Sequence, residues 1–270
     1  MTGRRVTTAA ALIRASHPEP GIAVSLLAMI LAVTWEASGG TTALIGVAAM
    51  TGQLTVGWSN DLIDRDRDQR SNRRDKPLAT GVLQPALVRG ATALSLAATV
   101  GASLSLGVRP GLLHLTLVAT GWAYNLGFKR TVLSWLPYAV CFGGLPVVVS
   151  LAAREVAGPE WTIIAGALLG TGAHLVNAVP DLEDDRRTGV VGLPHRLGAR
   201  RSINLATALM LTGTVVTVVV PVSSVDLFAV VVLAVSGALL VVGQLASGRG
   251  PFRAVLGIAL VNVVALLLRS

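Results

Sequence analysis

Two acidic segments are the residues of this chain best suited to chemistry. One is NDLIDRDRD, which begins at Asn60, and the other is DLEDD, which begins at Asp181. If a helix continues past Asn60, then Asp61, Asp64 and Asp68 fall at i, i+3 and i+7 and share one face. Carboxylates crowded in this way repel each other unless a cation lies among them. Mg²⁺ prefers oxygen ligands and often binds through carboxylates and substrate phosphates, so we predict a magnesium site here.

The second segment repeats this pattern. Asp181 and Asp185 are four residues apart, and Asn177 lies one turn earlier on the same predicted stripe. Two such faces could hold two or three Mg²⁺ ions around a diphosphate and neutralise its charge as it leaves. The remaining charged residues of both segments are interpreted as solvated pairs at the membrane surface: Arg65, Asp66, Arg67, Glu183 and Asp184.

Basic residues near the acidic segments favour phosphate binding. Lys76 follows the first segment, and Lys129 lies in a later loop. Lys and Arg can bind the diphosphate oxygens that a metal leaves free. The alternative for these residues, and the preferred one for Arg73, Arg74 and Arg130, is that basic residues collect in cytoplasmic loops whatever the function.

The composition indicates that hydrophobic helices place these segments. Of the 270 residues, 53% are hydrophobic and 13% are charged, and the mean hydropathy is +0.69. These values are typical of a polytopic membrane protein. The net charge of +8 is better explained by basic loops beside anionic lipid headgroups than by nucleic-acid binding. We therefore expect membrane lipids, and no nucleic acid, among the partners.

Nine apolar runs are long enough to span a membrane. They lie at roughly 19–37, 41–60, 85–107, 110–128, 131–152, 160–180, 202–221, 225–246 and 251–268. With the N-terminus in the cytoplasm and the C-terminus outside, 19 of the 22 Lys and Arg fall on the cytoplasmic side, as the positive-inside rule requires. Nine of the 14 acidic residues belong to the loops after the second and sixth spans, on that same side.

Several motifs resemble those of the UbiA superfamily of intramembrane prenyltransferases. NDLIDRDRD has the form N-D-x-x-D-x-x-x-D, and DKPLATG after it is similar to the R-P-L-x-x-G element. NAVPDLEDDRRTGVVGLPHRLG resembles the second motif, D-x-x-x-D with a closing R-L-G, and YNLGFKR resembles the tyrosine and lysine segment. These motifs cover about 60 residues, whereas the nine-span pattern covers the whole chain.

The resemblance implies one UbiA-like transmembrane domain over residues 1–270, with acidic motif loops at about 60–84 and 177–200. Its fold would be an all-α bundle around a central cavity, with a cytoplasmic cap. Its function would be the Mg²⁺-dependent ionisation of a prenyl diphosphate donor and transfer of the prenyl group to a lipophilic acceptor, for example an aromatic or quinone precursor.

By matched position, the resemblance also implies roles for individual residues. Asp64, Asp68, Asp181 and Asp185 would be catalytic. The metal ligands would be these four residues together with Asn60 and Asp61. The substrate-binding residues would be Asn60, Lys76, Tyr124, Lys129 and Asn177.

Two positions depart from the family pattern. Lys76 stands where the family usually has Arg, so a point charge replaces a two-pronged guanidinium. Pro180 precedes Asp181 and cannot donate a helical hydrogen bond, so it is expected to start a new turn and to remove Asn177 from the stripe.

Other functions are also compatible with this sequence pattern. A UbiA-type terpene cyclase would use the same metal site without an external acceptor, and a sugar-phosphate variant would transfer phosphoribose. A transporter usually carries ionisable groups near the bilayer midplane, whereas here Glu36 is the only acidic residue near the interior of a span, and it lies at a predicted end. A scaffold without activity would not need every carboxylate of both motifs. His174 is interpreted as a packed polar residue or as a base for the acceptor. Trp58 and Tyr124 could shield a carbocation with their rings.

Overall fold

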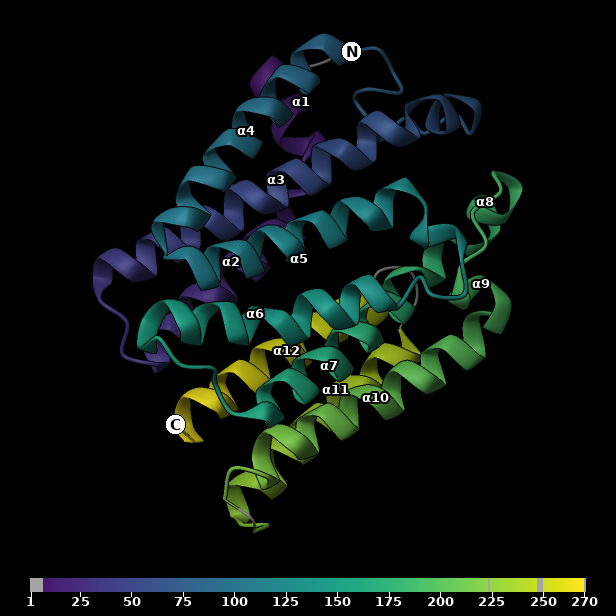
Figure 1. The fold of residues 1–270 in the computed structure, drawn as a ribbon. Coiled ribbons are helices and arrows are strands. Elements are labelled where there is room, and N and C mark those ends of the chain that lie inside the picture. The colour runs from purple at the N-terminus through teal and green to yellow at the C-terminus, as the bar shows by residue number, and fades with distance from the viewer. Residues whose placement is uncertain (1–6, 223, 247–249, 270) are drawn as a thin grey trace.

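The described part of the molecule is helical throughout. The computed structural model describes residues 7–222, 224–246 and 250–269, and within them all regular secondary structure is helix. This confirms the all-α prediction. Figure 1 shows the long helices running in broadly similar directions across the molecule, with the short helical segments of residues 182–197 at one end.

Nine helices within the described residues have 17 residues or more. They are α2 (Pro18–Thr34), α3 (Gly39–Arg70), α4 (Pro85–Ser105), α5 (Val108–Leu126), α6 (Leu136–Arg154), α7 (Glu160–Asn177), α10 (Ala199–Val219), α11 (Leu227–Leu245) and α12 (Gly250–Arg269). Each overlaps one of the nine predicted apolar runs. In the part of the chain that the structure describes, five helical segments are long and apolar enough to cross a membrane, or six if α1 (Thr8–Ala15) and α2 count as one bent span.

Helix α3 extends well beyond its apolar half. Ser38 begins it by accepting a hydrogen bond from the backbone N–H of Thr41 at 3.1 Å. No Gly or Pro follows Gly57 until after Arg70, so nothing in the sequence interrupts the backbone hydrogen bonds. The helix therefore carries the whole NDLIDRDRD segment, as the spacing of its carboxylates requires.

Small residues allow the helices of the bundle to approach closely. Helix α3 packs against α2, α4 and α5, and α7 packs between α6 and α10. A side chain at Gly166 would collide with the carbonyl oxygen of Phe142, and one at Gly170 would lie 2.8 Å from the carbonyl oxygen of Tyr138. Close contact through small residues is the usual way in which helices associate in lipid.

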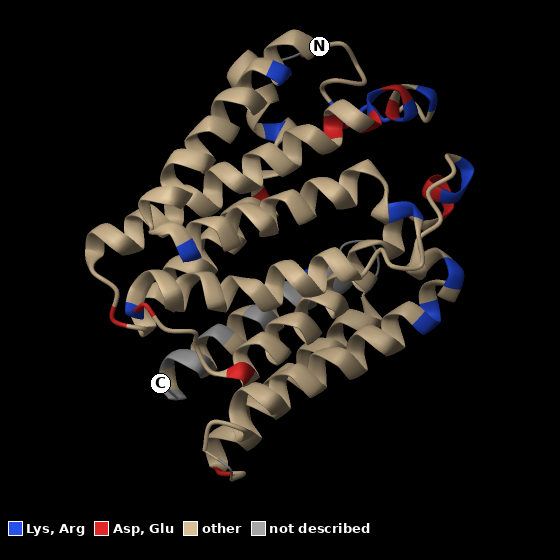
Figure 2. Ribbon diagram, viewed as in Figure 1, with Lys and Arg blue, Asp and Glu red and all other residues tan. Residues whose placement is uncertain are grey.

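Charged residues collect at the end of the bundle where α3 terminates. Figure 2 shows blue and red segments at the end of α3, at the loop after α5, at α8 (Leu182–Arg187) and at the start of α10, with few elsewhere. This uneven distribution of charge agrees with the sequence analysis, which assigns most charged loops to one side of the membrane. Arg4, Arg5 and Arg249, which also enter that assignment, lie outside the described residues.

An N-terminal helix precedes the first long helix and is not expected from the sequence. Helix α1 bends by 66° into α2, and His17 at the bend has a positive φ of 53°. The Trp58 indole donates to the carbonyl oxygen of Leu12 at 2.9 Å. A side chain at Gly57 would collide with the backbone of Ser16. Helix α1 is thus held against α3 one turn before the first acidic segment.

Candidate active site

The carboxylates of the first segment form one buried face of α3. Asp61, Asp64 and Asp68 are 1%, 1% and 3% exposed, whereas Asp66 points outward. Burial of three carboxylates costs free energy unless cations or hydrogen-bond donors accompany them. Their partners therefore determine what this face can do.

Asp61 is paired on one of its two oxygens only. Its Oδ1 lies 2.5 Å from Lys76 Nζ and 2.9 Å from His17 Nε2, and Lys76 Nζ lies 2.8 Å from the same His17 nitrogen. Its Oδ2 is buried and has no hydrogen-bond partner. Since an orphaned buried oxygen is costly, this atom is a ready ligand for a cation.

Asp64 is held by two cationic side chains from different elements. Lys129, on η1 (Phe128–Arg130), approaches both carboxylate oxygens at 2.7 and 2.6 Å. Arg67 donates to Oδ2 at 3.0 Å from one turn further along α3. The lysine predicted from the tyrosine and lysine motif thus reaches the first acidic segment, although 65 residues separate it from Asp64.

The second acidic segment is divided between two short helices. Helix α7 ends at Asn177, η2 (Val179–Asp181) contains Pro180, and α8 begins at Leu182. The proline therefore starts a new turn, as predicted. Asp181 and Asp185 lie next to the first segment through two arginines: Arg73 Nη1 is 3.7 Å from Asp181, and Arg67 Nη1 is 3.9 Å from Asp185.

A buried polar network fixes the loop after the second segment. His195 Nε2 lies 3.3 Å from Asp185 Oδ2, and Arg186 donates to the His195 carbonyl oxygen. The Ser134 hydroxyl accepts from the backbone N–H of Leu193 at 3.0 Å and lies 3.0 Å from His174 Nε2. His195, in the GLPHRLG segment, is therefore a direct neighbour of the acidic site.

Aromatic rings gather beside this network. Tyr124 and Tyr138 lie edge to face, with centroids 5.4 Å apart, and the His174 ring is 4.8 Å from Tyr138. Asn177 interacts with Tyr138. Tyr124 is thus part of an aromatic cluster, whereas Trp58 packs against α1 on another side of α3.

Asn60 is tied into the bundle rather than to the carboxylates. Its side-chain amide donates to Asn125 Oδ1 at 3.1 Å. Asn125 in turn donates to the Ser59 hydroxyl and to the Val56 carbonyl oxygen, each at 2.9 Å. These bonds join α3 to α5 just before the acidic face begins. Asn125 has no role in the sequence prediction.

Two other residues escaped the sequence-based reasoning. His17 is distant in sequence and has no metal-binding spacing, yet the bend between α1 and α2 places it on Asp61. Arg67 was interpreted as a solvated residue, but its side chain is only 17% exposed. Its position one turn after Asp64 is the one signal that could have revealed the contact.

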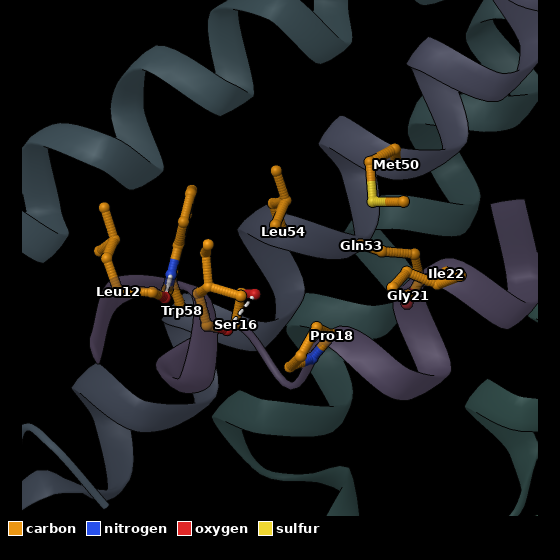
Figure 3. Close-up of a pocket in the computed structure, with 10 residues that line it drawn as sticks. Leu12, Ser16, Pro18, Gly21, Ile22, Met50, Gln53, Leu54 and Trp58 are labelled. Carbon is orange, nitrogen blue, oxygen red and sulfur yellow. Dashed lines mark hydrogen bonds between the residues drawn. The ribbon is translucent and has the colours of Figure 1, made fainter. Parts of the chain in front are cut away.

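Two pockets adjoin these residues. One pocket, of about 380 Å³, lies between α1, α2 and α3. Its lining side chains include Leu12, Ile22, Met50 and Trp58 (Figure 3). Another, of about 530 Å³, is lined by Arg70, Ser71 and Asn72 at the end of α3 and by Asp184, Arg187 and Thr188 at α8. The second pocket lies between the two acidic segments.

The electrostatics of the site reflect burial opposed by charge pairing. Burial raises the pKa of Asp68, although Lys76 and Arg67 oppose this shift. Burial also lowers the pKa of Lys129, while Asp64 acts in the opposite direction. At the exposed edge, hydrogen bonds from Arg73 hold the pKa of Asp75 at about 2.

The donor set fits a hard divalent cation. Among the described residues, no three His, Cys, Asp or Glu side chains are already converged on a metal position, and cationic side chains contact Asp61, Asp64 and Asp68. The available ligands are nevertheless all oxygens, and Asp61 Oδ2 is free to coordinate. Oxygen ligands of this kind suit Mg²⁺.

Comparison with known proteins places the chain in a family. The model of the UbiA prenyltransferase family matches residues 22–265, nearly the whole chain. The chain belongs to the UbiA prenyltransferase family. The resemblance that the sequence motifs indicated is thereby confirmed.

Relatives from two organisms support this assignment. The bacteriochlorophyll synthase 33 kDa chain of Cereibacter sphaeroides is 31% identical over 65% of this chain and 61% of its own length. The lycopene elongase/hydratase of Halobacterium salinarum is 27% identical over 58% of each chain. The chain thus spans about three fifths of the length of these curated relatives.

Solved structures show the same fold. A UbiA homolog from Aeropyrum pernix K1 matches with a TM-score of 0.75 and 18% identity, covering 93% of this chain and 98% of its own. A UbiA homolog from Archaeoglobus fulgidus, solved with GPP and Mg²⁺, matches with a TM-score of 0.70 and 17% identity over 95% and 99%. At these identities the likeness establishes the UbiA fold.

Proposed function

We propose that this chain is a Mg²⁺-dependent intramembrane prenyltransferase that ionises a prenyl diphosphate and transfers the prenyl group to a lipophilic, aromatic or quinone-type acceptor. The observation that carries the proposal is the buried face of Asp61, Asp64 and Asp68 beside Lys76 and Lys129. Family membership and the Archaeoglobus fulgidus homolog solved with GPP and Mg²⁺ support it.

The carboxylates of both segments would hold the metal, with Asn60 and Asn177 as supporting polar groups. Mg²⁺ bound there would neutralise the negative charge that develops on the diphosphate as its bond to the allylic carbon breaks. Lys76 and Lys129, which already point at this face, would donate to diphosphate oxygens that lack a metal contact. A charge placed in advance needs little reorganisation during the reaction.

The aromatic cluster would receive the allylic cation. Tyr124 on α5 and Tyr138 on α6 lie edge to face, and aromatic ring faces can stabilise positive charge and exclude water. His174 stands beside them and could take the proton that an aromatic acceptor loses. The cation would then react with the acceptor and not with water.

Residues 1–270 would form one UbiA-like domain embedded in a cell membrane through nine spans, with the N-terminus and both acidic loops in the cytoplasm and the C-terminus outside. The acidic loops, α8 and α9 (Leu193–Leu197) would form a cap over the central cavity. The concentration of charge at this end of the bundle supports that orientation.

Diphosphate release from purified protein tests the proposed function. Geranyl, farnesyl and geranylgeranyl diphosphate would be supplied with Mg²⁺ or EDTA, with and without a membrane extract as the acceptor source. We expect Mg²⁺-dependent release that needs the extract and yields a prenylated acceptor by mass spectrometry. Release without extract that yields a cyclic hydrocarbon or alcohol would identify a terpene cyclase instead.

Variants would locate the reaction in the acidic site. Asp64→Asn should abolish release, because the buried carboxylate is lost from the metal face. Glu183→Gln is the matched control, since Glu183 lies within the second motif but is exposed and pairs with the exposed Arg187. Equal activity of the two variants would contradict the proposed site, and silence of the wild type under every condition would contradict the proposed reaction.

A further inference from the structure

Arg67 makes contacts that a solvated surface residue would not make. Its guanidinium lies 3.0 Å from Asp64 Oδ2, 3.5 Å from Asp68 Oδ1 and 3.9 Å from Asp185 Oδ1. Two of these carboxylates are on its own helix, and the third is on α8. Within the described residues, Arg67 is the one side chain that forms ion pairs with two carboxylates of the first acidic segment and with a carboxylate of the second.

The position of this guanidinium is also the position that a metal would need. A divalent cation shared by Asp64, Asp68 and Asp185 would lie where these three carboxylates meet, and the Arg67 guanidinium lies there now. Two cations cannot occupy the same carboxylate face closely without strong repulsion. Metal binding to these three residues therefore requires the Arg67 side chain to move away.

We propose that Arg67 is an internal counter-ion that occupies the shared metal position until the metal arrives with the diphosphate, and then turns to the diphosphate oxygens. This inference rests on the proposed function. A metal alone would have to displace a guanidinium without compensation. A metal accompanied by a diphosphate brings anionic oxygens to which the displaced guanidinium can donate two parallel hydrogen bonds.

Arg67 is thus a positioning residue with a selective effect. It disfavours the bare metal and favours the metal with its diphosphate, so the two ligands bind cooperatively. It also holds α8 against α3 while the site awaits its substrate. A lysine here would retain the charge but would lose the planar fork that contacts several carboxylates at once.

Binding measurements without catalysis test this inference. Mn²⁺ replaces Mg²⁺ as a paramagnetic probe, and its binding to detergent-purified protein is measured by electron paramagnetic resonance with and without inorganic pyrophosphate. The variants are Arg67→Gln, Arg67→Lys and the control Arg89→Gln. Arg89 lies on α4, is exposed and belongs to neither acidic segment.

We expect Arg67→Gln to bind Mn²⁺ alone about tenfold more tightly than wild type and to bind pyrophosphate in the presence of Mn²⁺ about tenfold more weakly. The affinities of Arg67→Lys should lie between those of wild type and Arg67→Gln, and those of Arg89→Gln should match wild type. If Arg67 had only a structural role, Arg67→Gln would bind both Mn²⁺ and pyrophosphate more weakly. That outcome would overturn the inference.

The failure of this inference differs from failure of the proposed function. Wild-type binding of Mn²⁺ and pyrophosphate, with unchanged affinities in Arg67→Gln, would overturn the counter-ion role alone. If the wild type bound neither Mn²⁺ nor pyrophosphate, the proposed metal site would be overturned, and the role of Arg67 with it. Thermal unfolding of each variant confirms that it is folded before binding is measured.

Discussion

Lys129 approaches both carboxylate oxygens of Asp64, at 2.7 and 2.6 Å, and both side chains are buried. One ammonium group from the loop after α5 thereby neutralises the central carboxylate of the α3 face. Because a buried carboxylate cannot remain uncompensated at low cost, this contact joins the stability of the bundle to the state of its site.

Replacement of Lys129 by Met should destabilise the protein without metal. Breaking a buried ion pair by removing one partner costs about 3 kcal/mol or more, so the melting temperature in detergent should fall by several degrees. Added Mg²⁺ should recover part of the loss, because the metal supplies the missing positive charge. The exposed neighbour Arg130 provides the control variant Arg130→Gln. Equal melting temperatures for the two variants would contradict this account.

Asp68 and Asp66 offer a matched comparison on one helix. Asp68 is 3% exposed and faces the site, whereas Asp66 points outward. Asp68→Asn should lower kcat/KM for diphosphate release by about a hundredfold or more, in line with the loss of a metal-binding group. Asp66→Asn should stay within about twofold of wild type. A similar loss in both variants would show that total charge, and not the buried face, controls the rate.

His17 should matter for the substrate, although it is distant from both motifs in sequence. The His17→Asn variant retains a residue that tolerates positive φ but cannot keep the imidazole contact with Asp61 and Lys76. We expect KM for the prenyl diphosphate to rise about tenfold. Glu155→Asn is the control, since Glu155 also has a positive φ, of 61°, but lies at the opposite end of the bundle. The prediction fails if the two variants have the same KM.

The contact between α1 and α3 predicts opposite effects for two glycine substitutions. A methyl group at Gly57 would collide with the Ser16 backbone, so Gly57→Ala should lower the free energy of unfolding by about 1–3 kcal/mol. Nothing lies within 4 Å of a methyl group at Gly101 in the interior of α4, so Gly101→Ala should raise it by about 0.5–1 kcal/mol. Thermal or denaturant unfolding of both variants measures these changes. Equal destabilisation by Gly57→Ala and Gly101→Ala would contradict the close contact between Gly57 and the Ser16 backbone.

Labelling can test the proposed membrane orientation. Cys141 is the sole cysteine, so a Cys141→Ala background permits single cysteines at the exposed positions Arg74 and Val156. In intact cells, an impermeant maleimide should label Val156→Cys and spare Arg74→Cys until the cells are opened. The reverse pattern would overturn the proposed cytoplasmic location of the acidic loops.

The sequence predicted the parts of this structure that depend on periodicity. Asp61, Asp64 and Asp68 were expected on one face because α-helical spacing fixes side-chain direction, and an apolar run fixes where a long helix lies. The break at Pro180 was predictable too, since proline lacks a backbone donor.

Contacts that depend on tertiary packing were beyond the sequence. Nothing local indicates that His17 would meet Asp61, because that contact needs both the bend between α1 and α2 and the close approach at Gly57. Arg67 and Arg73 carry the same charge as their solvated neighbours, and their contacts with Asp185 and Asp181 depend on the placement of the second acidic segment beside α3. Asn125 was missed for the same reason, as its partners lie on another helix.

The extension of α3 past its apolar half has a consequence for the products of the proposed reaction. The carboxylates stand at the polar end of the bundle, whereas the apolar half of α3 continues among helices that face lipid. A cleaved diphosphate would leave toward water, and the prenylated product would stay in the hydrocarbon layer. The two products would enter different phases as soon as they form, and this partitioning would make the reverse reaction rare without any separate export step.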